Sequence, residues 1–127
     1  MSNVSNLFNS VAETDFFHLL QNGTPDGKKV AELLKYKKED ISEAADVSID
    51  SIRFDKRMPE KLKERFIEWA NALNLVGSFF NDPDKTVLWF QISNPALGGM
   101  KPKDMIRYGR YAKLLRYIQT ALDENKR

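Results

Sequence analysis

The sequence predicts an all-α protein, in which an N-terminal helix-turn-helix bundle is followed by a small helical domain. Three observations lead to this fold class. Apolar residues recur at helical spacing nearly throughout the chain after Lys28. Prolines and glycines stand where such helices would begin or end. No alternating apolar and polar run is paired with a hairpin turn, so no strand is expected.

The first 26 residues are expected to form an appendage. The chain holds 127 residues, 42% of them hydrophobic and 30% charged, which suits one ordinary domain or a small domain with an appendage. Gly and Pro within residues 22–27 would stop a helix. The appendage is therefore either a docked helix or a mobile tail, with apolar side chains at Leu7, Phe8, Val11, Phe16, Phe17, Leu19 and Leu20.

Residues 27–80 predict a bundle with a long connecting helix. Short helices are expected near Val30–Leu34 and over Lys38–Ala45, and Ser48 is a suitable N-cap for a third. Pro59 suits the first turn of the long helix. Its apolar residues repeat at intervals of 4 and 3, which is typical of a core spine or a dimer face. We favour the core spine, although a homodimer is also expected and would use this seam: Leu62, Phe66, Trp69, Leu73, Val76 and Phe80.

Residues 81–127 predict a second helical unit. Asp82 and Pro83 form a helix start, and the apolar run Val87–Phe90 with Ile92 predicts a segment that is buried on most sides. An irregular loop follows, and Pro102 opens a short helix that Gly109 closes in a left-handed conformation. The last helix spans residues 110–124, with its apolar face at Tyr111, Leu114, Leu115, Ile118 and Leu122.

Charge is distributed unevenly along the chain. Residues 1–26 contain three acids and no Lys or Arg, which gives −3, and residues 27–100 contain twelve of each sign. Residues 101–127 contain eight basic and three acidic residues, which gives +5. The acidic appendage is therefore complementary to the basic end, and docking between them is one expectation.

Composition argues against an enzyme. The chain has no Cys and a single His, His18, which is more often a partly packed ring than a catalytic base. No phosphate-binding loop, nucleophile elbow or metal-ligand spacing is present, so no cofactor or metal is expected. Neither a membrane span nor a secretory signal is apparent, and the expected location is the cytoplasm.

Residues 39–53 resemble the helix-turn-helix of Xre-type repressors. Two departures stand at Ser42, where Ala is usual, and at Asp46, where Gly is usual. Residues 28–65 carry only +2, from eleven basic and nine acidic residues, so the electrostatic footprint of a DNA-binding surface is weak. Two interpretations of this segment remain open: it is a structural scaffold that does not read DNA, or it binds DNA. The candidate DNA contacts are Ser48, Asp50, Ser51, Arg53, Lys56 and Arg57.

The segment from Val87 onward resembles the toxin-binding domain of Xre/MbcA/ParS-type antitoxins. That family has a Trp-containing helix, an Asn-Pro-x-Leu-Gly-Gly loop, a Pro-x-Asp/Glu helix start, a short helix ending at Gly and a last amphipathic helix. One departure is Lys101, where Thr would cap the helix. The matching residues that shape the loop and its flanks are Trp89, Phe90, Asn94, Pro95, Ala96, Leu97, Gly98, Gly99, Pro102, Asp104, Gly109 and Tyr111.

This resemblance covers roughly residues 37–124 and implies an antitoxin, while residues 1–26 lie outside it. The chain is expected to have three segments, residues 1–26, 27–80 and 81–127. Family members bind a RES-domain toxin that degrades NAD, cover its active-site cleft, and in many cases repress their own operon. A cognate RES-domain toxin and operator DNA are therefore the expected partners. The alternative is a DNA-binding regulator without a toxin, whose C-terminal helices serve dimerisation. The expected toxin-binding side chains are Arg107, Arg110, Lys113, Arg116, Lys126 and Arg127.

Overall fold

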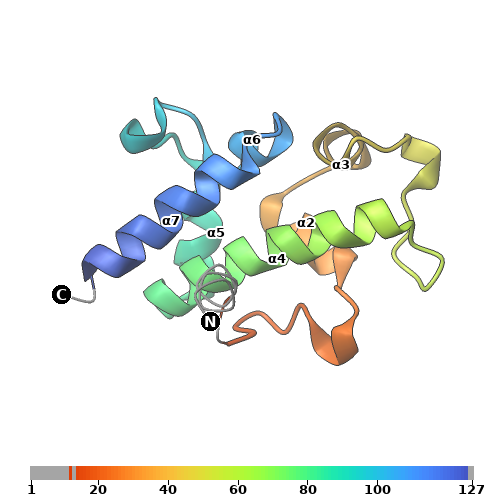
Figure 1. The fold of residues 1–127 in the computed structure, drawn as a ribbon, viewed down its shortest axis with the longest axis horizontal. Coiled ribbons are helices and arrows are strands. Elements are labelled where there is room, and N and C mark those ends of the chain that lie inside the picture. Colours follow the sequence, from red (N-terminus) through yellow and green to blue (C-terminus); the bar gives the residue numbers. More distant parts are fainter. Residues whose placement is uncertain (1–11, 13, 126–127) are drawn as a thin grey trace, which may run out of the picture.

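The computed structural model describes residues 12 and 14–125, and within them it contains helices and no strand, so the all-α prediction is confirmed (Figure 1). None of the helices described is long and apolar enough to span a membrane. Six α-helices and three single 3₁₀ turns follow one another as η1 (Gln21–Gly23), α2 (Gly27–Leu34), α3 (Lys38–Ala45), η2 (Ile49–Ser51), α4 (Glu60–Phe80), α5 (Pro83–Gln91), η3 (Pro95–Leu97), α6 (Pro102–Arg107) and α7 (Tyr111–Asn125).

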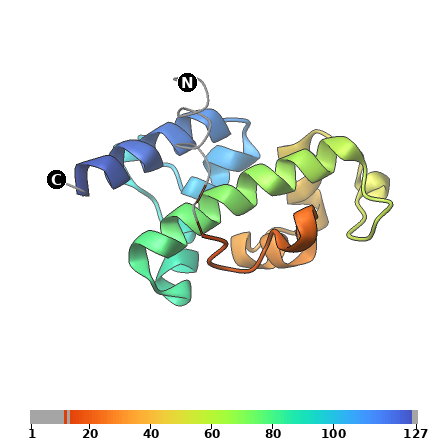
Figure 2. The same cartoon turned by 60° about the horizontal axis from the view of Figure 1, so that its bottom comes forward.

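Helix α4 is the spine of the fold. Figure 2 shows it running through the molecule, with α6 and α7 on one side and α2 on the other. Its predicted seam is buried from Leu62 to Val76, while Phe80 at the end is half-buried. The core-spine prediction is therefore confirmed, and the chain itself already covers this seam. Pro59 occupies the N-cap position, and Asn81 ends the helix in a left-handed conformation with φ of 52°.

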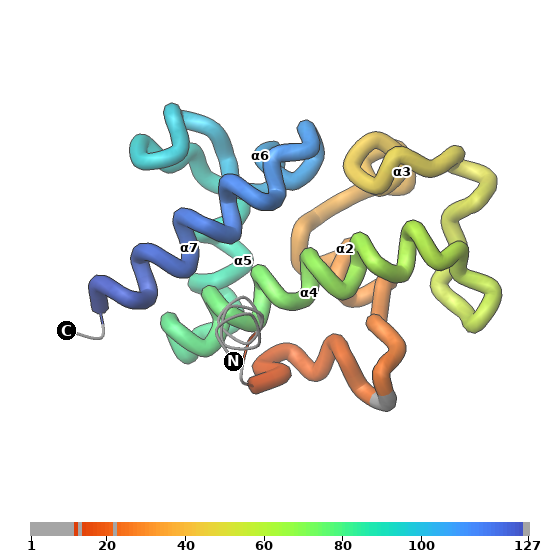
Figure 3. The backbone as a smooth tube through the Cα atoms, viewed as in Figure 1, coloured from red at the N-terminus to blue at the C-terminus, as the bar shows by residue number. Residues whose placement is uncertain are grey.

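The appendage predicted at the N-terminus is, over residues 14–26, a strap packed against α4. Phe17 and Leu19 are buried, and Figure 3 shows the segment running along the helix before it turns into α2. The Asn74 amide oxygen, fully buried in α4, accepts from the Phe17 backbone N–H at 3.0 Å. We refer to residues 14–26 as the N-terminal strap. The predicted apolar residues Leu7, Phe8 and Val11 lie outside the described residues.

One carboxylate organises the turn at the centre of the strap. Asp15 accepts from the backbone N–H groups of Leu19 and Leu20 and from the Asn74 amide, all at 2.8–2.9 Å. Burial alone would raise the pKa of Asp15, but these hydrogen bonds outweigh it and hold the pKa below its usual value. Asp15 is thus committed to the strap, and Asp26 caps α2 by accepting from Lys29 N–H. Neither described acid reaches the basic end of the chain.

The helix-turn-helix prediction is correct in its first half and wrong in its second. Helix α3 has the predicted bounds, and Asp46 adopts the left-handed conformation expected of it, with φ of 56°. After the turn, however, residues 49–51 form only a single 3₁₀ turn, and Ser48 makes no cap to the backbone. Only Ile52 of this segment is buried. A short helix needs a buried apolar face to be stable, and this segment offers too little of one.

One hydrophobic core joins the two halves of the chain. The predicted boundary after residue 80 coincides with the end of α4, but Trp69, Phe90 and Met105 belong to the same buried cluster. Two hydrogen bonds also cross between the halves. The Tyr36 hydroxyl donates to the Lys103 carbonyl, and the Gln91 amide donates to the Leu34 carbonyl at 3.1 Å. The C-terminal unit therefore packs directly against the bundle.

Candidate functional site

The loop of residues 94–100 is closed by its own hydrogen bonds. The Asn94 side chain accepts from Ala96 N–H at 2.9 Å, its carbonyl accepts from Gly99 N–H, and its N–H donates to the Met100 carbonyl. Gly98 and Gly99 have φ of 69° and 84°, a region that disfavours residues with a Cβ. Leu97 is buried beneath the loop. These contacts hold the loop closed, and the shaping role expected of Asn94, Pro95, Leu97, Gly98 and Gly99 stays a prediction.

The short helix after this loop begins and ends as its residues predict. Pro102 is its first residue, Lys101 provides no side-chain cap, and Gly109 follows the last turn with φ of 79°. The Tyr111 hydroxyl then donates to the Glu68 carbonyl of α4 at 2.6 Å. Burial raises the pKa of Tyr111 well above its ordinary value, so the hydroxyl keeps the proton it donates. This bond fixes the start of α7 on the spine.

Arg107 lies at the centre of an ion-pair cluster within the chain. Its guanidinium nitrogens lie 3.3 Å from Asp40, 3.4 Å from Glu43 and 3.2 Å from Asp104. The Tyr108 hydroxyl adds a further contact at 2.7 Å. Although burial opposes it, hydrogen bonds to Asp40 and Tyr108 raise the pKa of Arg107. Predicted as a toxin-binding residue, Arg107 is instead occupied in joining α6 to α3.

Removal of this cluster should destabilise the fold. We expect Arg107→Ala to lower the free energy of unfolding by about 2 kcal/mol, because it leaves the half-buried Asp40 and Asp104 without their cation. Urea denaturation followed by tryptophan fluorescence measures this change. Arg110→Ala is the matched control and should be neutral within about 0.5 kcal/mol, since Arg110 is exposed and makes no ion pair in the part of the chain described. Equal stabilities for the two variants would contradict the assignment.

The remaining predicted cations of α7 are free of ion pairs within residues 12 and 14–125. Arg110, Lys113 and Arg116 are all exposed, and the one polar contact among them joins Arg110 to the Met100 sulfur at 3.6 Å. They follow one another at intervals of three residues and therefore form a band along one side of the helix. We call these three residues the basic band. Lys126 and Arg127, also predicted to bind the toxin, lie outside the described residues.

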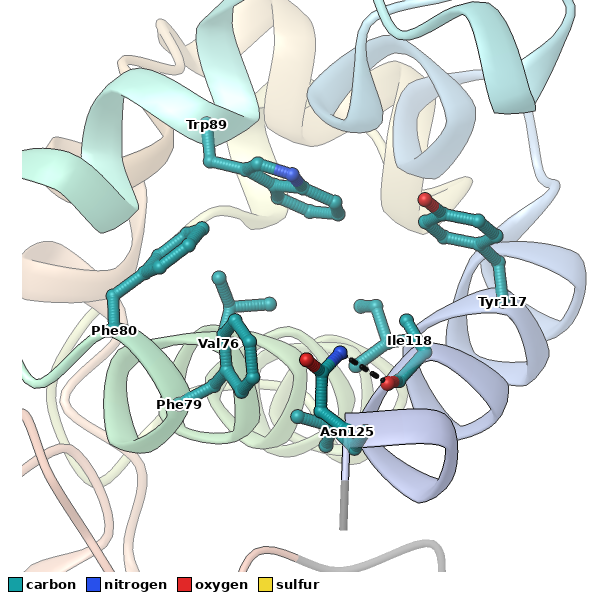
Figure 4. Close-up of a pocket in the computed structure, with 9 residues that line it drawn as sticks. Val76, Phe79, Phe80, Trp89, Tyr117, Ile118 and Asn125 are labelled. Atoms are coloured by element: carbon teal, nitrogen blue, oxygen red, sulfur yellow. Dashed lines mark hydrogen bonds between the residues drawn. The ribbon is translucent and has the colours of Figure 1, made fainter. Parts of the chain in front are cut away.

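An apolar pocket opens beside the same helix, where the ends of α4, α5 and α7 meet. Figure 4 shows Trp89 at the top of the pocket, Val76 and Phe79 of α4 below it, and Tyr117 of α7 at its right. The pocket has a volume of about 220 Å³. Its full lining is Val76, Phe79, Phe80, Trp89, Tyr117, Ile118, Ala121, Leu122 and Asn125.

Helix α5 adds exposed apolar surface that the sequence analysis did not foresee. Leu88 and Ile92 are 57% and 49% exposed, and Phe79 at the pocket is 47% exposed. The predicted burial of the Val87–Ile92 segment is therefore wrong for two of its residues. A signal was available, because consecutive apolar residues on a helix point in different directions and cannot all face one core. Exposed apolar residues that are contiguous on a surface are typical of a binding site.

The candidate DNA contacts lie in the loop between α3 and α4. Arg53, Lys56 and Arg57 are exposed, and the Ser48 and Ser51 hydroxyls are bonded to each other at 2.6 Å. Because the predicted second helix is not formed, no helix here presents Asp50 or Ser51 to a groove.

The single histidine, His18, is exposed on the strap, and its Nδ1 lies 3.3 Å from the Gln21 side-chain amide nitrogen. No three His, Cys, Asp or Glu residues among those described are grouped as metal ligands.

Comparisons with known proteins give one partial likeness. No family model matches the sequence, and no curated protein matches it. A similar solved structure is the crystal structure of the M. tuberculosis MbcT-MbcA toxin-antitoxin complex, one chain of which is 25% identical to this chain. The match covers 73% of this chain and 86% of that chain, with a TM-score of 0.45. The backbones agree only loosely, so the functional argument rests on the residues described above.

Proposed function

We propose that this chain is an antitoxin that binds a RES-domain toxin through residues 85–127. The observation that carries the proposal is that two surfaces, the basic band and the apolar pocket, both involve helix α7. The loop of residues 94–100 and α6 position α7, whose basic band is exposed and whose other side borders the apolar pocket. An apolar centre with charged residues around it is the usual composition of a protein–protein interface.

Binding would neutralise the toxin by covering its cleft. The sequence resemblance implies a toxin that degrades NAD, so the block would act by keeping the dinucleotide out. The exposed cations of α7 would then lie against acids or carbonyl groups of the toxin, because a cleft that binds a phosphate-bearing dinucleotide tolerates Arg or Lys only where its own walls offer such acceptors. Both proteins would act in the cytoplasm, where NAD is held.

Repression of an operon gains no support from the geometry. The loop that carries Arg53, Lys56 and Arg57 is exposed, but it lacks the recognition helix that would enter a DNA groove. A homodimer through the Leu62–Phe80 seam is likewise unsupported, since the chain's own core covers that seam. The exposed features of α7 and the pocket therefore favour a toxin-binding protein over a DNA-binding regulator.

Co-expression tests the proposal directly. The gene is expressed together with a neighbouring gene for a RES-domain protein, and only the toxin carries an affinity tag. We expect this chain to co-purify with the toxin and to remain bound through size-exclusion chromatography. Recovery of the tagged toxin without this chain, while the chain is present and soluble in the same lysate, would refute the proposal.

A further inference from the structure

Two buried asparagines of α4 hold the backbone of the N-terminal part of the chain. Asn74 accepts from the Phe17 N–H of the strap at 3.0 Å. Asn71, three residues earlier, accepts from the Ala12 backbone N–H through its amide oxygen. Residues three apart on a helix lie on the same side of it. One side of α4 therefore supplies acceptors for both backbone groups.

This side of α4 also has a glycine where the strap packs against the helix. Gly77 lies within α4, although glycine is a poor helix former. A Cβ at this position would lie 2.6 Å from Phe16 Cδ2 and 2.8 Å from Phe17 Cε2. The missing side chain therefore allows the two rings of the strap to pack directly on the helix.

Asn71 also contacts the first residue of α7. The Tyr111 hydroxyl donates to the Glu68 carbonyl at 2.6 Å. Burial raises the pKa of this hydroxyl, whereas a hydrogen bond with the Asn71 side chain lowers it. A hydrogen bond that lowers the pKa of a phenol is one donated to its oxygen. The Asn71 amide nitrogen therefore faces Tyr111, while its oxygen faces Ala12.

The two contacts of Asn71 depend on each other. An amide has a donor end and an acceptor end, and here each end has a different partner. Reversal of the amide would bring two donors together at Ala12 and two oxygens together at Tyr111, whose proton is committed to Glu68. Buried polar groups left without a partner are destabilising. Ala12, while docked, therefore holds the amide in the orientation that serves Tyr111.

We propose that Asn71 couples docking of Ala12 and the N-terminal strap to the placement of α7, so that release of the strap loosens the first turn of α7. Asn71 is a positioning residue in this scheme. Arg110 and Lys113 flank Tyr111 in the sequence, so the coupled turn carries two of the three residues of the basic band. Such coupling is reciprocal. A partner bound to this turn strengthens docking of the strap, and a partner that captures the strap weakens the hold on α7.

Hydrogen exchange of the full chain, with no partner added, tests the coupling. Ala12→Pro removes the N–H group that Asn71 accepts, because proline has none. The Leu114 N–H donates to the Arg110 carbonyl at the start of α7. We expect its exchange to become about five- to tenfold faster in this variant, the effect of losing one hydrogen bond. Unchanged exchange at Leu114 would overturn the proposal.

Two controls make this result specific. Ala12→Ser keeps the backbone N–H and should leave exchange at Leu114 as it is in the native chain. The Ile41 N–H occupies the corresponding position at the start of α3, and it should exchange equally fast in all three chains. Equal acceleration at Ile41 and Leu114 would indicate a loss of global stability and contradict the coupling.

A double-mutant cycle tests whether the effect passes through Asn71. Tyr111→Phe removes the hydroxyl that Asn71 contacts. In a chain with this change, Ala12→Pro should cause no further acceleration at Leu114. By reciprocity, Tyr111→Phe alone should speed exchange of the Phe17 N–H in the strap. An effect of Ala12→Pro that is equally large with and without the hydroxyl would exclude this role of Asn71. The free chain provides every readout, and only the consequence for a toxin rests on the proposed function.

Discussion

Replacement of Arg110 and Arg116 by Glu in the same chain is expected to abolish protection of growing cells against the toxin. Both side chains are exposed, and neither takes part in an ion pair within the described part of the chain, so the fold does not need them. In the proposed interface each reversal turns an attraction into a repulsion. We expect the affinity to fall by at least about 100-fold, or roughly 2.7 kcal/mol. Growth after toxin induction and titration calorimetry measure the two effects.

The control for this experiment is a charge reversal of the same size elsewhere. Arg53→Glu with Arg57→Glu changes the net charge equally, on the exposed loop before α4. This variant should protect cells as the native chain does, because the loop lies outside residues 85–127. Equal loss of protection in both variants would point to net charge, rather than the basic band, as the cause.

Replacement of Asn74 by Leu should cause the largest loss of stability. Asn74 is fully buried, and its amide bonds both the Phe17 N–H and the Asp15 carboxylate. Without it a buried N–H group is unsatisfied, which costs about 1–3 kcal/mol, and the strap that buries Phe17 is weakened. We expect the free energy of unfolding to fall by about 3 kcal/mol, as measured by urea denaturation.

An exposed position on the same helix provides the comparison. Ser78→Ala changes a solvent-facing side chain of α4 and should alter stability by no more than about 0.5 kcal/mol. If Asn74→Leu were as mild as Ser78→Ala, the strap would contribute nothing to the stability of the fold.

The fold was largely predictable because its helices are marked by local signals. The spacing of Leu62, Phe66 and Trp69 predicted the spine, and Pro83 and Pro102 marked helix starts that the structure confirms. The failure at Ser48 has a different origin. A cap residue and one inward Ile favour a helix locally, but a short helix depends on tertiary burial, and Ile49 is 46% exposed.

The site was predictable in its scaffold but not in its surface. The positions of Gly98 and Gly99 follow from left-handed backbone conformations that few residue types adopt, and that of Asn94 follows from its side-chain oxygen, which accepts from Ala96 N–H. Whether a cation is free depends instead on residues distant in the chain. Arg107 and Arg110 are both basic residues of the same short segment, but α3 brings Asp40 beside Arg107, which forms an ion pair with it.

The central claim is that this chain stops an NAD-degrading toxin by binding it. The most direct measurement is the rate of NAD consumption by the purified toxin as this protein is added in increasing amounts. We predict that the rate falls to background near an equimolar ratio and that the Arg110→Glu with Arg116→Glu variant leaves it high. A rate that stays unchanged at a large excess of the native protein would contradict the account.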